Sequence, residues 1–233
     1  MASGLRTFCL GLLVSALMAS IPAQFGGVAS AGTIDLFSQP GTGSNNVSGA
    51  NVGIFVSPAW ATPPTGAEWI SYGATGCNTF VAATGICTPG PQNPPGTTLA
   101  TPTAIFYQTF VVTDTLDTGT LDVWADDTAG VFLDDVTTGI NSMLWAPDPN
   151  LGQNCAGGPI GCVEGMDAQI PLSLGPGTYT LVIDAYQLVG GSPFGIMYDG
   201  VLSNTSTPEP ATYMLMGLGL AGLATLLRRR KRG

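Results

Sequence analysis

The sequence lacks basic side chains over almost its whole length. It has 233 residues and no histidine, and its six lysines and arginines are Arg6 and the five residues of 228–232. All fifteen acidic residues lie within 35–209, a stretch that contains no cation. Because no group there can neutralise a phosphate backbone, nucleic-acid binding is excluded. Ser-His-Asp and Cys-His catalysis in their usual forms are also excluded, as are Arg or Lys clamps on a transition state.

Helical patterning is also missing from the body of the chain, and strand patterning takes its place. Apolar and polar side chains alternate strictly in 120–126 and 177–187, which is typical of half-buried strands. With 33 glycines and 18 prolines along the chain, the pattern predicts an all-β fold, a sandwich or a barrel. Further strands are expected at 33–37, 52–56, 79–82, 105–112, 130–133, 168–174 and 194–201.

The N-terminal segment 1–31 has the pattern of a secretory signal peptide. Arg6 forms a short positive region, an apolar run follows, and Ala29-Ser30-Ala31 fits a small-residue cleavage site. Signal peptidase is therefore expected to cut after Ala31, with cleavage after Ala23 as an alternative. An uncleaved N-terminal anchor is the competing interpretation.

The C-terminal segment 208–233 has three parts. Pro208, Glu209 and Pro210 come first, and an uncharged apolar run follows at 211–227. Its length is near the lower limit for a transmembrane helix, roughly 17 residues, and the cytoplasmic side of such a helix carries the positive charges. Within it, GLGLAG at 217–222 lacks the following acidic residue that a dinucleotide site requires. The basic end consists of Arg228, Arg229, Arg230, Lys231 and Arg232.

In the order and spacing of its parts, this tail resembles the PEP-CTERM sorting signal of Gram-negative bacteria. The resemblance covers about 207–233. It implies that an exosortase, a membrane protease-transpeptidase, recognises and processes the tail. It also implies transient insertion of a precursor into the inner membrane, followed by release or attachment at the cell surface. A plain C-terminal membrane anchor is the alternative, and both interpretations export the body, 32–207.

A second, weaker resemblance concerns the body between about 104 and 201. The segments GTLDVWADDTAGVFLDD and PLSLGPGTYTLVIDAYQLVGGSPFGIMYDG flank a loop that contains cysteine. Together they are similar to exported sandwich domains that look like galactose-binding-like and other carbohydrate-binding jelly rolls. The resemblance implies an antiparallel, jelly-roll-like β-sandwich at 32–207, followed by a C-terminal transmembrane helix at 211–227. It transfers no binding residues.

Four cysteines remain after signal-peptide removal: Cys77, Cys87, Cys155 and Cys162. An even number in an exported protein predicts disulfides, for which three connectivities exist. Proximity in the sequence favours Cys77–Cys87 and Cys155–Cys162. A zinc site is the alternative, although C-x-x-C spacing and histidine are both missing.

The acidic residues permit a calcium site without specifying one. Carboxylates and turn carbonyls are the ligands that calcium prefers, but no EF-hand pattern is present. The alternative is that these residues cap turns and solvate the surface. No cofactor is therefore assigned, and calcium stays open. The pairs Asp126-Asp127 and Asp134-Asp135 are expected to bracket a hairpin, TAGVFL, and the other candidate ligands are Asp148, Asp167, Asp184 and Asp199.

Two functional classes compete for the body. A carboxylate-dependent glycoside hydrolase would need two acidic groups, and its glutamate would be Glu68 or Glu164. A noncatalytic protein could stack sugars on aromatic rings, with Trp124, on the polar face of its strand, as the most interesting candidate; core packing is the alternative for these rings. The other aromatic candidates are Trp60, Trp69, Trp145, Tyr72, Tyr107, Tyr179, Tyr186 and Tyr198.

These observations favour an exported, noncatalytic protein of the cell surface or extracellular matrix, sorted by an exosortase and binding exopolysaccharide. No catalytic, cofactor or metal residue is assigned. A secreted glycoside hydrolase and a purely structural matrix component remain the alternatives.

Overall fold

The computed structural model describes residues 32–113, 117–148, 160–191, 193–204 and 216–222. The chain divides into two compact units, one formed by Gly32–Thr205 and one by the two ends. Within the second unit, residues 216–222 form a short helix. No helix in the described part of the chain is long and apolar enough to span a bilayer. The remainder of the expected transmembrane segment 211–227 lies outside the described residues.

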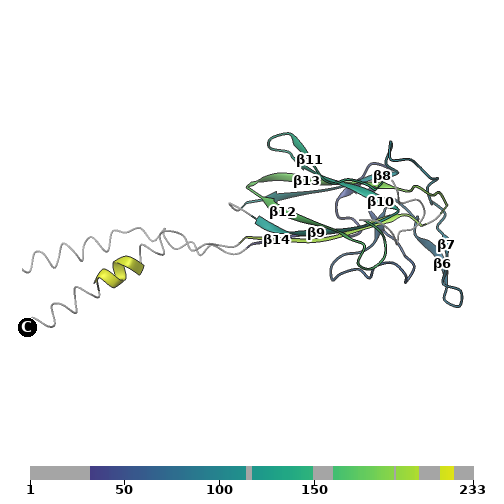
Figure 1. The fold of residues 1–233 in the computed structure, drawn as a ribbon, viewed down its shortest axis with the longest axis horizontal. Helices are drawn as coiled ribbons and strands as arrows, with labels where there is room; N and C mark the ends of the chain where they lie inside the picture. Colours follow the sequence, from purple (N-terminus) through teal and green to yellow (C-terminus); the bar gives the residue numbers. More distant parts are fainter. Residues whose placement is uncertain (1–31, 114–116, 149–159, 192, 205–215, 223–233) are drawn as a thin grey trace, which may run out of the picture. The chain divides into compact units, whose positions relative to one another are not determined.

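The unit Gly32–Thr205 contains two antiparallel sheets that stack as two layers (Figure 1). In sheet A the order is β12 (Ala168–Leu174), β9 (Asp117–Asp126), β14 (Gly195–Asn204), β5 (Ile70–Ser71) and β4 (Val52–Gly53), and β1 (Thr33–Phe37) also pairs with β14. In sheet B the order is β11 (Ile140–Trp145), β10 (Thr128–Asp135), β13 (Gly177–Tyr186), β8 (Ala104–Val112), β2 (Ser44–Asn45) and β3 (Gly49–Ala50). The predicted all-β sandwich is therefore confirmed.

A third sheet is a separate hairpin of β6 (Cys77–Val81) and β7 (Ile86–Pro89). It projects from the sandwich at the right of Figure 1. Its second strand ends at Pro89, where a proline-rich segment begins. Prolines have no backbone N–H to donate to the hydrogen-bond ladder of a central strand.

Period-two alternation builds the main core. Leu121, Val123 and Ala125 of β9 point inward and meet residues of β13 that follow the same rule. The inward residues of β13 are Tyr179, Leu181, Ile183 and Ala185, as the sequence pattern predicts. The strands expected at 33–37 and 168–174 have the predicted bounds, and those of β8, β9, β13 and β14 differ from the predicted ones by at most a few residues.

The strand expected at 52–56 is limited to Val52–Gly53, and the expected TAGVFL hairpin is wrong. The TAGVFL segment is not a hairpin bracketed by acidic pairs, because residues 128–135 form the single strand β10. Ala129, Val131 and Leu133 alternate into the core, so the segment follows the strand period. The chain instead crosses from sheet A to sheet B at Asp126-Asp127, and the hairpin comes after β10, where it leads to β11.

Candidate binding surface

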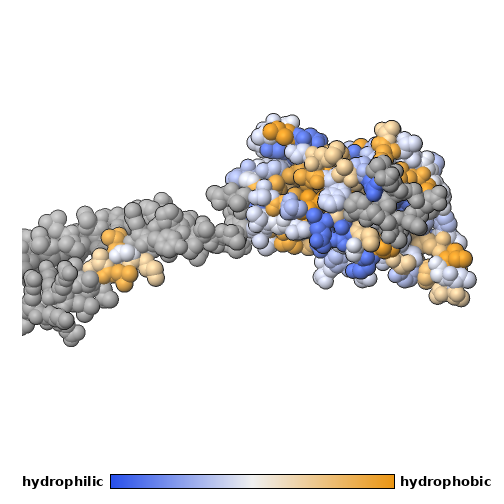
Figure 2. All heavy atoms as spheres, viewed as in Figure 1, coloured by the Kyte–Doolittle hydropathy of each residue, from blue (hydrophilic) through white to orange (hydrophobic). Residues whose placement is uncertain are grey.

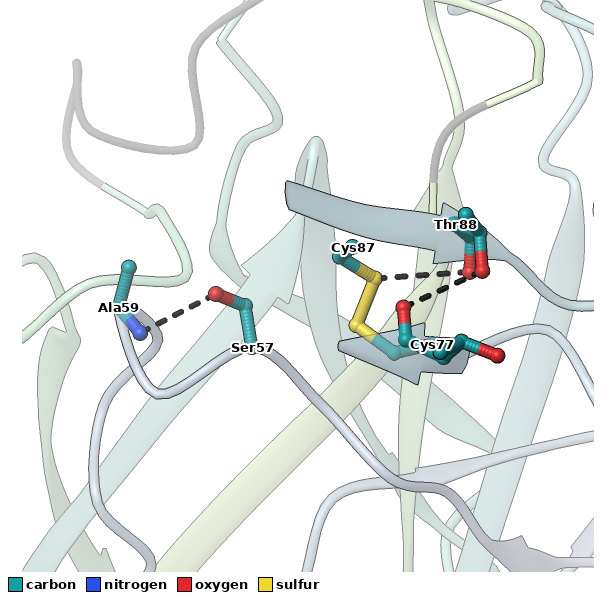
Figure 3. The surroundings of a disulfide bond; sticks show 6 residues. Ser57, Ala59, Cys77, Cys87 and Thr88 are labelled. Atoms are coloured by element: carbon teal, nitrogen blue, oxygen red, sulfur yellow. Dashed lines mark hydrogen bonds between the residues drawn. A yellow bond between two sulfur atoms is a disulfide. The ribbon is translucent and has the colours of Figure 1, made fainter. Parts of the chain in front are cut away.

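The predicted disulfide between Cys77 and Cys87 is present and joins β6 to β7 (Figure 3). Cys162 is also disulfide-bonded. Cys155 lies outside the described residues, so the pairing Cys155–Cys162 stays a prediction. Within the described part of the chain, no group of three His, Cys, Asp or Glu residues could hold a metal ion. The described cysteines therefore support a structural role.

A shallow pocket of about 170 Å³ lies beside this disulfide. Its walls include Phe55, Cys77 and Asn78, and none of its lining residues is acidic. Figure 2 shows hydrophobic residues over the neighbouring β6–β7 hairpin. Of the two glutamates considered for hydrolysis, Glu68 has Oε2 3.2 Å from the position that a Cβ of the lining residue Gly53 would occupy, and Glu164 Oε2 accepts a hydrogen bond from the Thr62 N–H at 3.2 Å. The pocket therefore lacks the carboxyl pair of a glycoside hydrolase.

Acidic side chains gather on the outer face of sheet A. Asp122 of β9 pairs in register with Asp199 of β14. Burial raises the pKa of Asp122, and the charges of Asp167 and Asp199 raise it further. Burial also raises the pKa of Asp199, with a contribution from the charge of Asp35. The aspartates repel one another here, because no basic side chain lies between residues 7 and 227 to compensate them.

Asp126 and Asp127, in contrast, are buried, with exposed fractions of 6% and 3%. Burial raises the pKa of Asp126 well above its usual range, and the hydrogen bond and charge of Asp127 act in the same direction. Asp127 Oδ2 accepts the N–H groups of Leu188 and Val189 at 2.7 and 3.0 Å. The pair thus holds the segment after β13 and is closed to a ligand.

The remaining acidic candidates are separated by the fold. Asp135 Oδ1 accepts the N–H groups of Thr137 and Thr138. A hydrogen bond from the Thr138 side chain, together with these backbone hydrogen bonds, lowers the pKa of Asp135. Asp135 therefore caps the turn after β10, as the simpler interpretation of the aspartates predicts. Asp184 belongs to β13, and the backbone N–H of Asp148 donates to the Thr128 hydroxyl.

Three of the tryptophans pack together on the outer face of sheet A and are not available to stack on a sugar. Trp124 is 7% exposed and packs with Trp60, Trp69 and Met197 in a cluster separate from the main core. The rings of Trp60 and Trp69 lie 4.5 Å apart, and Trp69 Nε1 donates to the Ala61 carbonyl at 3.0 Å. Trp124 as an exposed stacking platform is therefore wrong, because loop residues bury its ring.

Most other aromatic candidates are structural too. Trp145 packs against the main core, and Tyr179, Tyr186 and Tyr198 are buried. Tyr72 lies against Phe194, with ring centroids 5.8 Å apart. Tyr107 differs in its position, since it is partly exposed, as Tyr72 and Trp145 also are, but lies on the outer face of sheet B.

The outer face of sheet B carries a row of apolar side chains, one from each of four adjacent strands. Tyr107 pairs in register with Val182, Val182 with Phe132, and Phe132 with Met143. Because residues directly opposite in a ladder share a face, these four form a continuous stripe, which we call the face-B row. Met143 is 60% exposed, and both rings are partly exposed.

A polar row flanks the face-B row on one side, and a single carboxylate, that of Asp184, lies between Ile105 and Gly130 on the other. Thr109, Thr180 and Asp134 are successive register partners on one side, and the two threonine hydroxyl groups are 2.9 Å apart. Asp184 pairs with Ile105 on the other side, and burial raises its pKa. The face thus combines rings with hydrogen-bonding groups.

Glycine at position 130 sets the position of the Phe132 ring. A Cβ atom at Gly130 would lie 3.2 Å from Phe132 Cε2 and 3.2 Å from Pro147 Cδ. The ring therefore leans over the glycine, where any larger side chain would crowd it. The sequence interpretation named Tyr107 but missed Phe132 and Met143. The alternation of Gly130, Phe132 and Asp134 against the core-facing Ala129, Val131 and Leu133 is the signal for Phe132.

Comparisons with known proteins concern the C-terminal tail. Residues 206–231 match the family model described as the PEP-CTERM protein-sorting motif. No curated protein matches the chain. Pro208, Glu209, Pro210 and the basic residues 228–232 fall within the matched segment, outside the residues whose structure is described.

Proposed function

We propose that this exported, exosortase-sorted protein acts outside the cytoplasm as a noncatalytic polysaccharide-binding protein. Its sorting motif at 206–231 supports export and processing by an exosortase. Its body supplies a two-layer sandwich on which loops cover the tryptophan part of one outer face and the other face presents aromatic rings among polar groups. The place of action is the cell surface or the extracellular matrix.

The observation that carries the binding role is the face-B row. Partly exposed aromatic rings between hydroxyl and carboxylate groups suit a sugar, whose ring faces are apolar and whose hydroxyl groups donate hydrogen bonds. Two of the acidic sites considered for hydrolysis are unsuited to it, because the pair Asp126-Asp127 is buried and no lining residue of the pocket beside the disulfide is acidic.

Processing is expected to follow the order of the signals along the chain. Signal peptidase removes 1–31, the segment 211–227 holds the precursor in the inner membrane, and the exosortase acts near Pro208, Glu209 and Pro210. Intact-mass spectrometry of protein recovered outside the cell should therefore find no residue beyond about Pro210. Secreted protein that still carries 228–233 would contradict this step. Glu209→Ala should retain the precursor in the membrane fraction.

Binding is tested on the exported protein with a panel of soluble and insoluble polysaccharides. Retention of the protein without release of reducing ends supports the proposed function. Release of reducing ends would instead show a glycoside hydrolase. No retention on any polymer of the panel would favour a purely structural role.

A further inference from the structure

We propose that the face-B row binds an uncharged glycan chain, which lies across the strands and donates hydroxyl hydrogen bonds to Asp134 and Asp184. This inference rests on the proposed polysaccharide-binding function and names its site and its ligand class. Tyr107 and Phe132 are the two stacking positions, and the largely covered side chain of Val182 lies between them.

The spacing of the two rings follows from the sheet. Tyr107 and Phe132 belong to β8 and β10, which both pair with β13, and their common register partner is Val182. Neighbouring strands are separated by about 4.8 Å, so the two backbone positions are about 10 Å apart. Val182 points outward but is only 8% exposed, so its neighbours cover most of its side chain. An extended polymer can therefore contact both rings along one line, perpendicular to the strands.

The Phe132 ring is already in a stacking orientation. Its Cε2 and Cζ atoms lie 3.2 and 3.6 Å from the position that a Cβ of Gly130 would occupy. Gly130 is two residues before Phe132 on the same face of β10, so the ring extends along the sheet surface instead of standing upright. Pro147 borders the same position. A ring held flat by its neighbours loses little freedom when a sugar ring stacks on it.

The flanking groups are suited to a ligand with many hydrogen-bond donors. Carboxylates accept hydrogen bonds and cannot donate when ionised, and sugar hydroxyl groups donate readily. Asp134 and Asp184 are both partly exposed, although Asp134 Oδ1 is itself shielded from solvent and has no hydrogen-bond partner among the described residues. Asp134 and Asp184 lie on opposite sides of the face-B row, since Asp134 pairs with Thr180 and Asp184 pairs with Gly130. A chain along the row can therefore be held from both edges.

The charge of the body selects an uncharged polymer. No lysine, arginine or histidine occurs between residues 7 and 227, and residues 69–113, which include β8, carry no charge of either sign. A uronate, sulfate or phosphate group on this face would meet two carboxylates and no cation, so anionic polymers and anionic lipid surfaces are repelled. Hydroxyl-rich neutral glycans avoid that penalty.

The experiment compares matched polymers on matched variants of the exported protein. Affinity electrophoresis and titration calorimetry use a neutral glucan, a neutral galactomannan and a polyuronate of similar length. Tyr107→Ala and Phe132→Ala should each weaken neutral-glycan binding about tenfold or more, the usual effect of truncating a central contact residue. Phe55→Ala is the control, because Phe55 is 60% exposed and lies at the pocket beside the disulfide, away from sheet B.

Two further variants separate stacking from folding and from charge. Tyr107→Phe retains the ring and should bind within a factor of about three of the native protein, whereas a variant that merely fails to fold loses its unfolding transition. The double variant Asp134→Asn, Asp184→Asn should bind the neutral glycan more weakly than the native protein does. It should bind the polyuronate more tightly, because the two repelling charges are gone.

The outcomes distinguish the proposed site from the proposed function. If Phe55→Ala weakens neutral-glycan binding while Tyr107→Ala and Phe132→Ala leave it unchanged, the protein binds polysaccharide at another site. That result would overturn the site and retain the proposed function. Preference for the polyuronate, or binding of lipid vesicles or a protein through Tyr107 and Phe132, would overturn the ligand class. Absence of binding to every polysaccharide would overturn both proposals.

Discussion

In both sheets the strand period of two places some apolar side chains on the outer face, but these side chains differ in how far they are buried. On sheet A, Trp124 and Met197 point outward and are buried beneath Trp60 and Trp69. On sheet B, Tyr107, Phe132 and Met143 of the face-B row point outward and remain at least partly exposed, whereas Val182 between the rings is buried. An outward-facing apolar residue is therefore a structural residue where a loop covers it and a candidate binding residue where none does.

The cover on sheet A comes from loops that are far apart in the sequence. Trp60, Ala61 and Ala67 precede β5, and Cys162 follows β11. Backbone hydrogen bonds connect them, because the Ala61 N–H donates to the Cys162 carbonyl and the Ala125 N–H donates to the Gly161 carbonyl. The cover is thus fixed to β9 by backbone contacts as well as by packing.

The largest expected effect of a single change is the loss of this cover. Trp69→Ala removes a side chain that is 2% exposed and should lower the free energy of unfolding by about 3–5 kcal/mol, the usual cost of truncating a buried tryptophan. Urea denaturation followed by circular dichroism measures it. The matched change on sheet B, Tyr107→Ala, should cost about 1 kcal/mol or less, because its ring is partly exposed. If the two variants lost the same free energy of unfolding, the claim that Trp69 is structural and Tyr107 is open to a ligand would be contradicted.

The disulfide between Cys77 and Cys87 should have a smaller and more local effect. Its residues are separated by 10 positions, and a loop of that size corresponds to about 2–3 kcal/mol in the entropy model. Because β6 and β7 form their own two-stranded sheet, the loss in Cys77→Ser, Cys87→Ser should be confined to that hairpin. Hydrogen exchange should accelerate in 77–89 and stay unchanged in β8, β9 and β13. Faster exchange throughout both main sheets would contradict this separation.

The two sheets also differ in the burial of their aspartates, since Asp126 of β9 is buried and Asp184 of β13 is partly exposed. The raised pKa of Asp126 means that the folded state holds this proton more tightly than the unfolded chain does. Its stabilising contribution is complete below the unfolded pKa of about 3.9 and is lost as pH rises toward the folded pKa. Asp126→Asn keeps a neutral donor next to Asp127, so it should be the more stable protein at neutral pH and should have a flatter pH dependence.

Thermal unfolding between acidic and neutral pH measures this difference. An increase of a few degrees is expected for Asp126→Asn at neutral pH, since 1 kcal/mol corresponds to about 2–4 °C in a domain of this size. Asp184→Asn on sheet B is the control, and it should change the midpoint less, because Asp184 is partly exposed and solvent screens its charge. A lower midpoint for Asp126→Asn at neutral pH would show that Asp126 is ionised in the folded protein.

Most of the sandwich could be predicted from the sequence, because β9, β12 and β13 alternate cleanly between apolar and polar residues. Strand β11 could not, since most of its residues are exposed and its register with β10 is shifted by a bulge. Strand β5 has two residues, both buried, and shows no period. Such short or irregular strands depend on their partners more than on their own pattern.

The binding surface was harder to predict than the fold for a related reason. Trp124 and Phe132 both alternate with core residues in their strands, so the sequence assigns both to an outer face. Which of the two faces remains open depends on where loops such as 57–67 pack, and that packing is long-range. The sorting tail, by contrast, is a contiguous signal, and its match at 206–231 agrees with the sequence interpretation.

Oxidation of two methionines tests the open face of sheet B most directly. Met143 and Met197 both point outward from their sheets, but Met143 is 60% exposed at the end of the face-B row and Met197 is 0% exposed beneath the tryptophans. Dilute peroxide, followed by peptide mass spectrometry, should convert Met143 to the sulfoxide much faster than Met197. A saturating neutral glycan should slow the oxidation of Met143 and leave Met197 unchanged. An unchanged rate at Met143 with the glycan bound would contradict the proposed binding surface.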